Sequence, residues 1–415
     1  MSDHPHGVGD DVRMRGFARR DTVEAALAWL DAQALRLDSE VVSLQGASGR
    51  VLATSIVSDV DVPGFDRAAM DGYAVAADST EGASAYNPLL LDVIGDSLPG
   101  RPFGRAACAG QAVRIMTGAP MPAGADAVLP AEWADAVDDR HMRALDAVSP
   151  GKHVGTRGED ITRATKLFEA GRVLRPQDLG VLSSVGVAEV PVVRRPRVRL
   201  VVTGNELLPA GSRPRGHHIA DANGPMLTAL VERDGGVVDF PGLVPDEPGA
   251  ILDALRAEAD VVIVSGGSSV GIEDHAPALV AAHGDLAIHG IAMRPSSPTG
   301  LGRLGHRLVF LLPGNPVSCL CAYDFFAGRA IRALGGRART WPYRSIVAPL
   351  ARKISSSIGR LDYARVRVVD GVVEPLAIGG ASVLSSTTRA DGFVLVSADS
   401  EGYAPGATVE VWLYA

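Results

Sequence analysis

The sequence predicts a multidomain fold that combines an α/β part with β-rich parts. The chain has 415 residues, and at about 150 residues per domain this length predicts about three domains. Apolar runs alternate with segments of helical spacing between about residues 196 and 334, which is typical of βαβ units and of a parallel sheet buried on both faces. Short β-prone pieces separated by Gly and Pro turns occupy about 50–150 and 345–415, which predicts β-rich parts on both sides of the α/β part.

Composition excludes several classes of protein. Hydrophobic residues make up 47% of the chain and its net charge is −8, so it is globular and lacks the basic balance of a protein that binds nucleic acid by counterion release. No apolar run approaches the about 18 residues that span a bilayer, and residues 1–20 read as a polar tail without an apolar signal core. We therefore expect a cytoplasmic protein with no membrane or nucleic-acid partner. Three cysteines are too few for a disulfide framework.

Two helices are expected outside the α/β part. Asp21 is a good N-cap, with Glu24 three residues later and an apolar face after it, which predicts a helix through about residue 37. A second helical stretch runs from Arg175 to Gly186.

Three polar, Gly-bearing loops directly follow apolar runs in the α/β part. In an open α/β sheet such loops share one edge, where ligands bind. We therefore expect distant segments to converge on one crevice. The segments are Thr203-Gly204-Asn205-Glu206, Ser265-Gly266-Gly267-Ser268-Ser269-Val270-Gly271, and Pro313-Gly314-Asn315-Pro316.

The loop at 265–271 has two possible interpretations, an anion-binding site or an ordinary connection between a strand and a helix. Its backbone N–H groups, with the positive end of the next helix, are suited to bind an anion, but a lone Gly-rich loop is also a common tight βα connection. Asp274 follows closely and either holds a divalent cation beside the anion or complements the helix dipole.

Asp221 and Ser318 are further candidate ligand-binding residues next to predicted helices. Asp221 lies just before a helical segment and either coordinates Mg²⁺ or caps that helix. Ser318 lies in the first turn after a stiff Pro-Gly-Asn-Pro segment, where N–H and hydroxyl groups are suited to hold an oxyanion.

The order of motifs along the whole chain resembles the molybdopterin molybdenumtransferase family, which includes MoeA and the C-terminal domain of gephyrin. The matching stretches cover nearly the whole chain. They are DRAAMDGYAV (66–75), RIMTGAPMPAGADAV (114–128), VGTRGEDI (154–161), LRPQDLGVLSSVG (174–186), RVRLVVTGNEL (197–207), IADANGPML (219–227), VVIVSGGSSVGIEDH (261–275), LVFLLPGNPVS (308–318) and GRLDYAR (359–365).

This resemblance implies four domains and a homodimer. The domains are an α-rich linker from 1–49 and 150–190, an inserted β domain at 50–149, an α/β domain like molybdopterin adenylyltransferase at 191–342, and a C-terminal β-barrel at 343–415. The active cleft would use the α/β domain of one subunit and the inserted β domain of the other. Molybdopterin adenylyltransferase and apo-molybdoenzymes are the further partners that the family suggests.

The resemblance also implies the reaction and its residues. Molybdate would be transferred to adenylylated molybdopterin, giving molybdenum cofactor and AMP with Mg²⁺ present. Asp221 and Asp274 would be the metal-binding carboxylates, with Asp71 reaching across from the partner subunit and Glu159, Asp160 and Glu206 in support. The substrate would be bound by Thr203, Gly204, Asn223, Ser265, Gly266, Gly267, Ser269, Gly271, Arg294, Ser297, Pro298, Pro313, Gly314, Asn315, Ser318, Arg360 and Arg365.

One segment departs from the family pattern. Where the family usually has Lys-Pro-Gly-Lys-Pro, this chain has Arg294-Pro295-Ser296-Ser297-Pro298. Arg294 keeps the first positive charge and Ser297 loses the second. We expect Arg360 and Arg365, with Ser318, Ser385 and Ser386, to compensate. The departure leaves three hypotheses open: a working insertase, a non-catalytic molybdopterin carrier or scaffold, and a family member tuned to tungstate.

Overall fold

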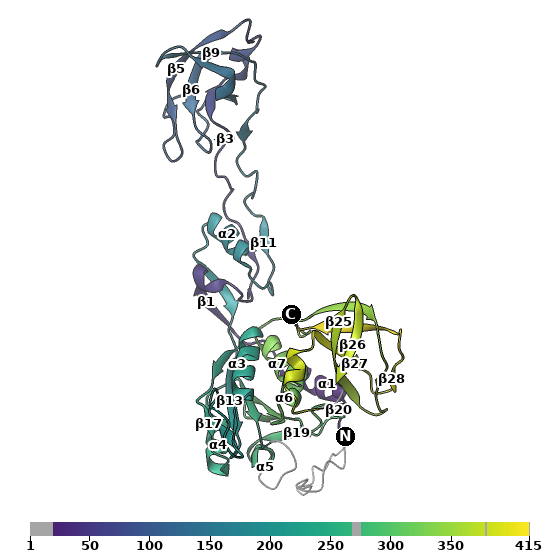
Figure 1. Ribbon diagram of the computed structural model, residues 1–415. Coiled ribbons are helices and arrows are strands. Elements are labelled where there is room, and N and C mark those ends of the chain that lie inside the picture. The colour runs from purple at the N-terminus through teal and green to yellow at the C-terminus, as the bar shows by residue number, and fades with distance from the viewer. Residues whose placement is uncertain (1–19, 268–274, 378–379, 415) are drawn as a thin grey trace, which may run out of the picture. The chain divides into compact units, whose positions relative to one another are not determined.

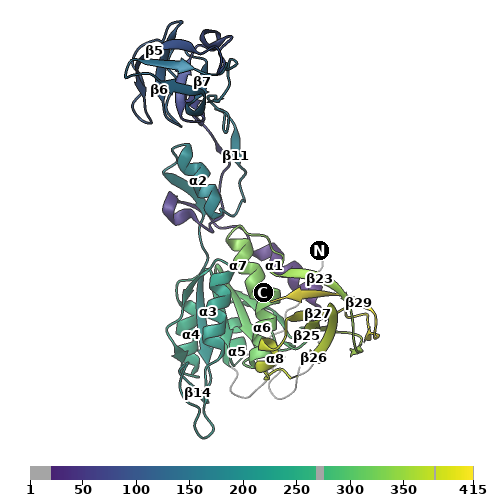
Figure 2. The same cartoon turned by 45° about the horizontal axis from the view of Figure 1, so that its top comes forward.

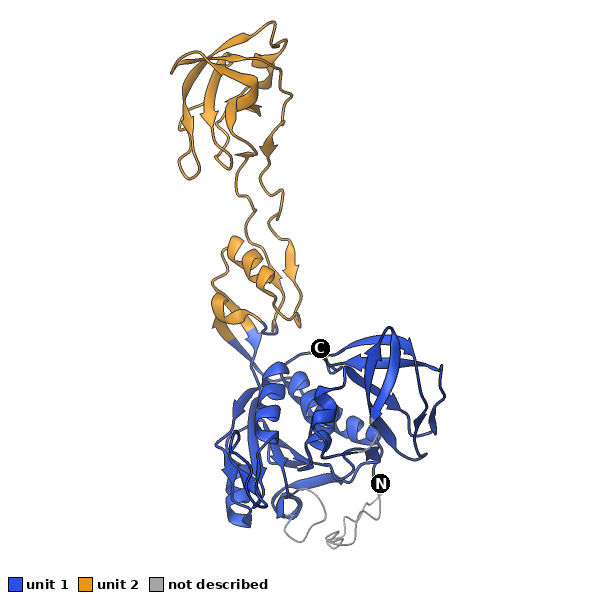
Figure 3. Cartoon of the chain, in the orientation of Figure 1, with its two compact units in different colours: residues 1–40, 49–51, 192–415 blue, residues 41–48, 52–191 orange. Residues whose placement is uncertain are grey.

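The computed structural model describes residues 20–267, 275–377 and 380–414. The chain forms two compact units (Figure 3). The first comprises residues 1–40, 49–51 and 192–415, and the second comprises residues 41–48 and 52–191. The second unit is thus an insertion in the sequence of the first, and the finer division into four domains stays a prediction.

A seven-stranded sheet organises the α/β part of the first unit (Figure 1). Its order is β16-β13-β18-β22-β21-β19, with β17 beside β13. The first four strands of this order and β17 pair in parallel, whereas β21 is antiparallel to both β22 and β19. The predicted parallel character therefore holds for the centre of the sheet. The strands are β13 (Arg197–Thr203), β16 (Val237–Asp239), β17 (Leu243–Val244), β18 (Val261–Ser265), β19 (Asp285–His289), β21 (Gly300–Leu304) and β22 (Arg307–Leu312).

Helices cover both faces of this sheet, as the apolar runs predict. Leu200, Ile263 and Phe310 face one core, which includes side chains from α1, α3 and α7. The alternate strand residues face a second core with α4 and α5 (Figure 2). The helical segments are α3 (Asn223–Arg233), α4 (Pro248–Arg256), α5 (His275–His283), α6 (Pro316–Ala322), the π-helical η4 (Tyr323–Ala327) and α7 (Gly328–Leu334).

Helix α1 (Val23–Gln33) begins and ends differently from the prediction. Thr22 is its N-cap and accepts a hydrogen bond from the Ala25 N–H at 3.1 Å. The predicted cap, Asp21, is instead extended: its N–H donates to the Gly290 carbonyl at 3.0 Å and its carbonyl accepts from the Ala292 N–H at 2.8 Å. This backbone pairing delays the helix by one residue, and the helix ends at Gln33 rather than near 37.

A six-stranded sheet forms the C-terminal part of the first unit, with order β20-β25-β27-β29-β23 and β26 beside β25. Its closure into a barrel stays a prediction. Its strands are β20 (Met293–Arg294), β23 (Arg344–Pro349), β25 (Leu361–Val369), β26 (Val372–Ala377), β27 (Gly392–Val396) and β29 (Thr408–Leu413). Smaller elements of the unit are β14 (Leu207–Leu208) with β15 (Ile219–Ala220), β24 (Ile354–Ser355) with β28 (Gly402–Tyr403), and α8 (Ser385–Thr388).

The second unit carries the expected β-rich insertion. Its six-stranded sheet has the order β7-β4-β6-β5-β9-β8, with strands β4 (Gly72–Val75), β5 (Leu89–Ser97), β6 (Gln111–Ile115), β7 (Ala127–Pro130), β8 (Ala134–Ala136) and β9 (His141–Ala144). The unit's other elements are η1 (Leu44–Ala47), β2 (Ile56–Val57), β3 (Arg67–Ala68), η2 (Ala77–Thr80), η3 (Ala131–Trp133), β10 (Val154–Gly155), β11 (Lys166–Phe168) and α2 (Pro176–Ser184). The boundary between the units runs through β1 (Ser39–Ser43) and β12 (Glu189–Val193).

No helix in the described part of the chain is long and apolar enough to cross a membrane.

Candidate active site

A cavity of about 720 Å³ lies in the first unit, where loops of the α/β part meet the C-terminal sheet. It is lined by most of the segment that departs from the family pattern, residues 294–298, and by neighbouring loops. Its lining includes Arg20, Arg294, Ser296, Ser297, Pro298, Pro313, Asn315, Ser318, Ser357, Arg360 and Gly380. Among the described residues that line it, the charged ones are all arginines, so the cavity is suited to an anion.

Strand pairing builds this cavity. β20 leaves the α/β part and pairs in parallel with β25, which places Arg294 directly opposite Asp362. The backbone bonds of Asp21 to Gly290 and Ala292 hold the chain beside the same loop. Arg20 therefore lines the cavity, a position that no sequence pattern indicates.

Asp362 is fully buried behind the cavity and binds two of its arginines. Its Oδ2 forms an ion pair with Nη2 of Arg294 and accepts a hydrogen bond from Ser356 Oγ at 2.7 Å. Its Oδ1 lies 3.2 Å from Nε of Arg360. The carboxylate is thus hydrogen-bonded to Arg294 through Oδ2, whereas its contact with Arg360 through Oδ1 is an ion pair without hydrogen-bond geometry.

The loop after Arg294 is held by one hydrogen bond within the loop and one to the first turn of α6. Ser296 has φ of +89°, an unusual value for a residue other than glycine. Its Oγ donates to the Ser318 carbonyl at 2.6 Å, and its carbonyl accepts from Thr299 Oγ1 at 2.7 Å. The next hydroxyl, Ser297 Oγ, is buried and has no hydrogen-bond partner within the described chain. A buried hydroxyl without a partner on a cavity wall is suited to bind a ligand oxygen.

Three of the residues expected to compensate for the lost lysine do not line this cavity. Arg365 is fully buried, and a Cβ added at Gly380 would lie 3.9 Å from its Nη2. Burial lowers the pKa of Arg365. Ser386 Oγ donates to the Val383 carbonyl at 2.6 Å, and Ser385 is likewise not on the wall. The structure therefore places these three side chains off the cavity wall, and their contact with the oxyanion stays a prediction.

A second group of predicted residues meets at the carboxyl edge of the α/β sheet. Asn223 Nδ2 donates to Ser265 Oγ at 2.8 Å and to the Gly314 carbonyl at 2.7 Å. Asn223 Oδ1 and Thr203 Oγ1 are buried without a partner within the described chain. Gly266 has φ of +97°, and a Cβ there would lie 2.1 Å from the Thr203 carbonyl oxygen. The three loops therefore converge, as predicted from the sheet edge.

The side chain of Asp221 accepts a hydrogen bond from the first turn of α3, next to the N-cap Ala222, which fits the capping role, one of its two predicted roles. It is 5% exposed, and its Oδ1 accepts from the Gly224 N–H at 2.9 Å. Its proposed metal partner Asp274 lies outside the described residues, as do Ser269 and Gly271. No group of three or more His, Cys, Asp or Glu side chains in the described ranges is arranged to hold a metal.

The remaining predicted residues of this edge are in loops. Glu206 is exposed, and a Cβ at Gly204 would lie 2.8 Å from its Oε2. Gly267 adopts φ of +57°. Gly314 lies near Gly266, since a Cβ added to it would come within 3.6 Å of the Gly266 Cα.

The second unit holds the other predicted carboxylates. Asp71 is exposed, and its Oδ1 accepts hydrogen bonds at 2.7 Å from both N–H and Oγ1 of Thr117. These bonds hold the pKa of Asp71 below its usual value. Glu159 pairs with Arg67 at 2.9 Å, and both line a cavity of about 440 Å³ with Thr117 and other residues. Asp160 is exposed.

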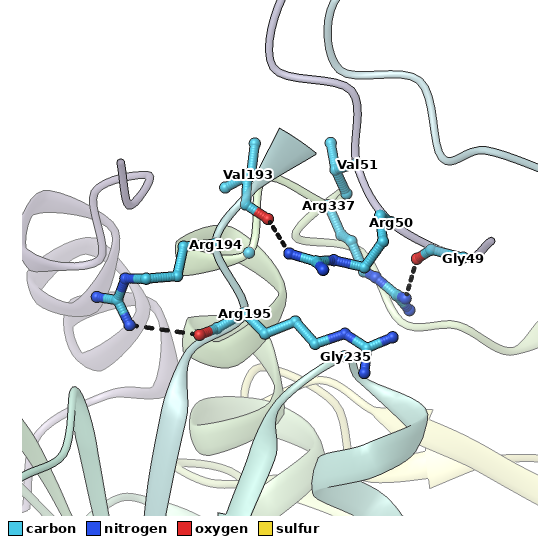
Figure 4. Close-up of a pocket in the computed structure, with 9 residues that line it drawn as sticks. Gly49, Arg50, Val51, Val193, Arg194, Arg195, Gly235 and Arg337 are labelled. Atoms are coloured by element: carbon cyan, nitrogen blue, oxygen red, sulfur yellow. Dashed lines mark hydrogen bonds between the residues drawn. The ribbon is translucent and has the colours of Figure 1, made fainter. Parts of the chain in front are cut away.

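A further group of arginines surrounds a much smaller cavity in the first unit (Figure 4). Arg50 donates to the Val193 carbonyl at 3.0 Å and Arg337 to the Gly49 carbonyl at 2.8 Å. The cavity measures about 10 Å³, which is room for about one water molecule. We assign these arginines to tethering the chain segments at 49–51 and 193–195 rather than to ligand binding.

Comparison with known protein families identifies the family of this chain. Three family models match: the MoeA N-terminal region over residues 21–186, a probable molybdopterin binding domain over 199–333, and the MoeA C-terminal region over 347–414. The chain belongs to the MoeA family. Its role is therefore in molybdenum cofactor biosynthesis.

Individual relatives of this MoeA-family protein match over most of their length. It is 34% identical over 385 residues to molybdopterin molybdenumtransferase 2 of Mycobacterium tuberculosis, covering 89% of this chain and 94% of the relative. It is 32% identical to the molybdopterin molybdenumtransferase of Haemophilus influenzae, covering 90% and 93%. A crystal structure of a molybdopterin biosynthesis MoeA protein from Pyrococcus horikoshii superposes with a TM-score of 0.82 at 32% identity, covering 96% of this chain and 100% of that one.

Two residues of this MoeA-family protein that were missed lie inside motifs quoted for the resemblance. Asp362 falls in GRLDYAR and Thr117 in RIMTGAP. The signal was therefore present, but only the three-dimensional pairing shows that Asp362 faces Arg294.

Proposed function

We propose that this protein is a molybdenum insertase that transfers molybdate to adenylylated molybdopterin and releases AMP. The relatives' names support this activity. The observation that carries it is the cavity of about 720 Å³, in which arginines and serines from four segments face one space.

The cavity is proposed to bind molybdate. Arg20, Arg294 and Arg360 line it, with the one carboxylate of Asp362 behind them. This leaves an excess of positive charge for a dianionic substrate. At an effective dielectric near 20, one charge about 4 Å from an anion contributes on the order of 4 kcal/mol before desolvation. Ser297 Oγ, buried and without a described partner, is suited to donate a further hydrogen bond.

The nucleotide and pyrophosphate side is proposed to bind at the carboxyl edge of the sheet. Backbone N–H groups of the segment beginning at Ser265 are suited to hold phosphate oxygens. The contacts of Asn223 to Ser265 and Gly314 fix two of the loops there. Electrostatic positioning is the main task in cleaving a phosphoanhydride. The described cysteines near this edge, Cys319 and Cys321, are buried, and burial raises the pKa of both thiols, so we assign them to packing rather than nucleophilic attack.

Mg²⁺ is proposed to bind at the same edge. The donors present are of the type that it prefers, since Asp221 offers a buried carboxylate and Asn223 Oδ1 a buried oxygen without a described partner. Asp221, with Asp274, would hold the ion. When bound, it would neutralise charge on the phosphoanhydride.

We also propose a homodimer in which Asp71 of the partner subunit, with Glu159 and Asp160, completes the cleft, and Glu206 supports it from the first subunit. The hydrogen bonds from Thr117 support this role, because they fix the position of the Asp71 carboxylate and hold its pKa below the usual value. Molybdopterin adenylyltransferase and apo-molybdoenzymes are the proposed donor and recipient partners.

The insertase proposal is tested by AMP formation. Purified full-length protein is mixed with adenylylated molybdopterin, Mg²⁺ and molybdate, and AMP is followed with time. We expect AMP above the rate without protein, and Asp221→Asn to lower it while the protein stays folded. Binding of the substrate without AMP formation would instead favour the carrier hypothesis.

Arg294→Ala tests the assignment of the oxyanion site. It should raise the KM for molybdate more than it raises the Kd for adenylylated molybdopterin, with Arg303→Ala as a control on an exposed strand residue. Equal effects on both constants would refute the assignment.

The serine at 297 favours a second candidate, an insertase tuned to tungstate. The site has one cation fewer than the family pattern and a free hydroxyl in its place. Competition of molybdate and tungstate in the AMP assay decides between the two substrates, and a preference for molybdate removes this candidate.

A further inference from the structure

We propose that Asp362 is a positioning residue for oxyanion binding, which holds Arg294 and Arg360 in the orientation that the anion needs. This inference rests on the proposed function, because it concerns the cavity assigned there to molybdate.

The burial of Asp362 makes its position informative. Its exposed fraction is 0%, and a buried carboxylate is costly unless cations and hydrogen bonds compensate it. The compensation comes from the cavity wall itself: Arg294 and Ser356 donate hydrogen bonds to Oδ2, and Arg360 forms an ion pair with Oδ1 that lacks hydrogen-bond geometry. The carboxylate therefore fixes the wall from behind.

The contacts leave guanidinium donors for a ligand. Arg294 uses Nη2 toward Asp362, while its Nε is buried and has no hydrogen-bond partner within the described chain. A guanidinium has five N–H donors in a rigid fork, so fixing one edge sets the direction of the others. Register fixes the backbone of the same pair, because Arg294 and Asp362 are directly opposite on β20 and β25.

A purely electrostatic role would give the opposite effect. A negative charge behind an anion site weakens anion binding, so removing it without loss of geometry should tighten binding. A positioning role predicts weaker binding on removal, because the arginines lose the partner that orients them. The sign of the change separates the two.

The experiment measures binding of sodium molybdate to the full-length protein by calorimetry. For Asp362→Asn we expect the Kd to rise by about tenfold or more, the loss typical of a hydrogen bond between charged groups. Adenylylated molybdopterin should bind as in the wild type. Asp239→Asn is the matched control. It also removes one negative charge, but Asp239 lies on β16, where it forms a surface ion pair with Arg199 of β13.

Ser356→Ala keeps the test decisive if Asp362→Asn fails to fold. It removes only the 2.7 Å hydrogen bond to Asp362 Oδ2, and we expect the Kd for molybdate to rise about fivefold. An unchanged Kd would then overturn the inference.

The outcomes separate this inference from the proposed function. If Arg294→Ala weakens molybdate binding but Asp362→Asn leaves it unchanged or tightens it, the positioning role is wrong and the oxyanion site stands. If Arg294→Ala has no effect either, the assignment of the cavity to molybdate fails.

Discussion

Asn223 joins two loops of the sheet edge through one side-chain nitrogen. Its Nδ2 donates to the Gly314 carbonyl at 2.7 Å and to Ser265 Oγ at 2.8 Å. The two acceptors belong to segments 49 residues apart in the chain, which follow the neighbouring strands β18 and β22. The strand pairing sets the spacing of the two loops, and the amide adds a link between them just beyond the strand ends.

Asn223→Ala should lower the free energy of unfolding by about 1–3 kcal/mol, because it removes the hydrogen bonds to the buried Ser265 hydroxyl and to the part-buried Gly314 carbonyl. Urea denaturation measures this change. Asn205→Ala, in an exposed loop, serves as the control and should stay within about 0.5 kcal/mol of the wild type. Equal stability of the two variants would show that water replaces the lost amide.

Gly266→Ala should impair both folding and AMP formation. Gly266 adopts φ of +97°, and the new Cβ would lie 2.1 Å from the Thr203 carbonyl oxygen, so the loop must move. Gly249→Ala is the control, because a Cβ at that position in α4 meets nothing within 4 Å. We expect it to match or slightly exceed wild-type thermal stability. An active, stable Gly266→Ala protein would show that this tight approach is not needed.

Ser297→Lys should restore the family's second cation and lower the KM for molybdate. One added charge near the anion gives up to about 4 kcal/mol before desolvation and side-chain ordering reduce it, so we expect a fall of about tenfold. Ser297→Ala should raise the KM instead, because it removes the hydroxyl donor. Steady-state AMP formation at varied molybdate measures both. A higher KM for the lysine variant would mean that the serine is the better ligand here.

Thr117→Val should move the acid limit of activity to higher pH. The two hydrogen bonds from Thr117 lower the pKa of Asp71, so the wild-type carboxylate stays ionised to a lower pH than an ordinary aspartate. Without them its pKa rises toward the usual value, and ionisation is lost earlier as the pH falls. The pH dependence of kcat/KM measures this shift, and Thr162→Val, whose hydroxyl contacts Thr165 at 2.9 Å, is the control. An unmoved acid limb would remove Asp71 from the groups that must be ionised.

Much of the fold was predictable from local patterns. The buried runs at β13, β18 and β22 and their polar endings follow from sequence alone, because parallel strands share one edge. The start of α1 at Val23 rather than after Asp21 was not predictable, since a backbone pairing with Gly290 and Ala292 competes with the cap.

The site was predictable only in part, because it too depends on pairing between segments that are distant in the sequence. Arg294, Ser297 and Arg360 were expected and line one cavity. Asp362 was not expected, because its role depends on the register between β20 and β25. Arg365 was expected to help bind the anion, whereas the structure buries it away from the cavity wall.

The pairing of β20 with β25 has a consequence for engineering. The dipeptide Met293–Arg294 belongs in sequence to the α/β segment but in space to the C-terminal sheet. In a chimera that exchanges only the residues after about 343, the β25 strand of a homologue would pair with the original β20 strand that carries Arg294. Such exchanges should carry 293–298 and 356–362 together as one cassette, since these two stretches share a single carboxylate.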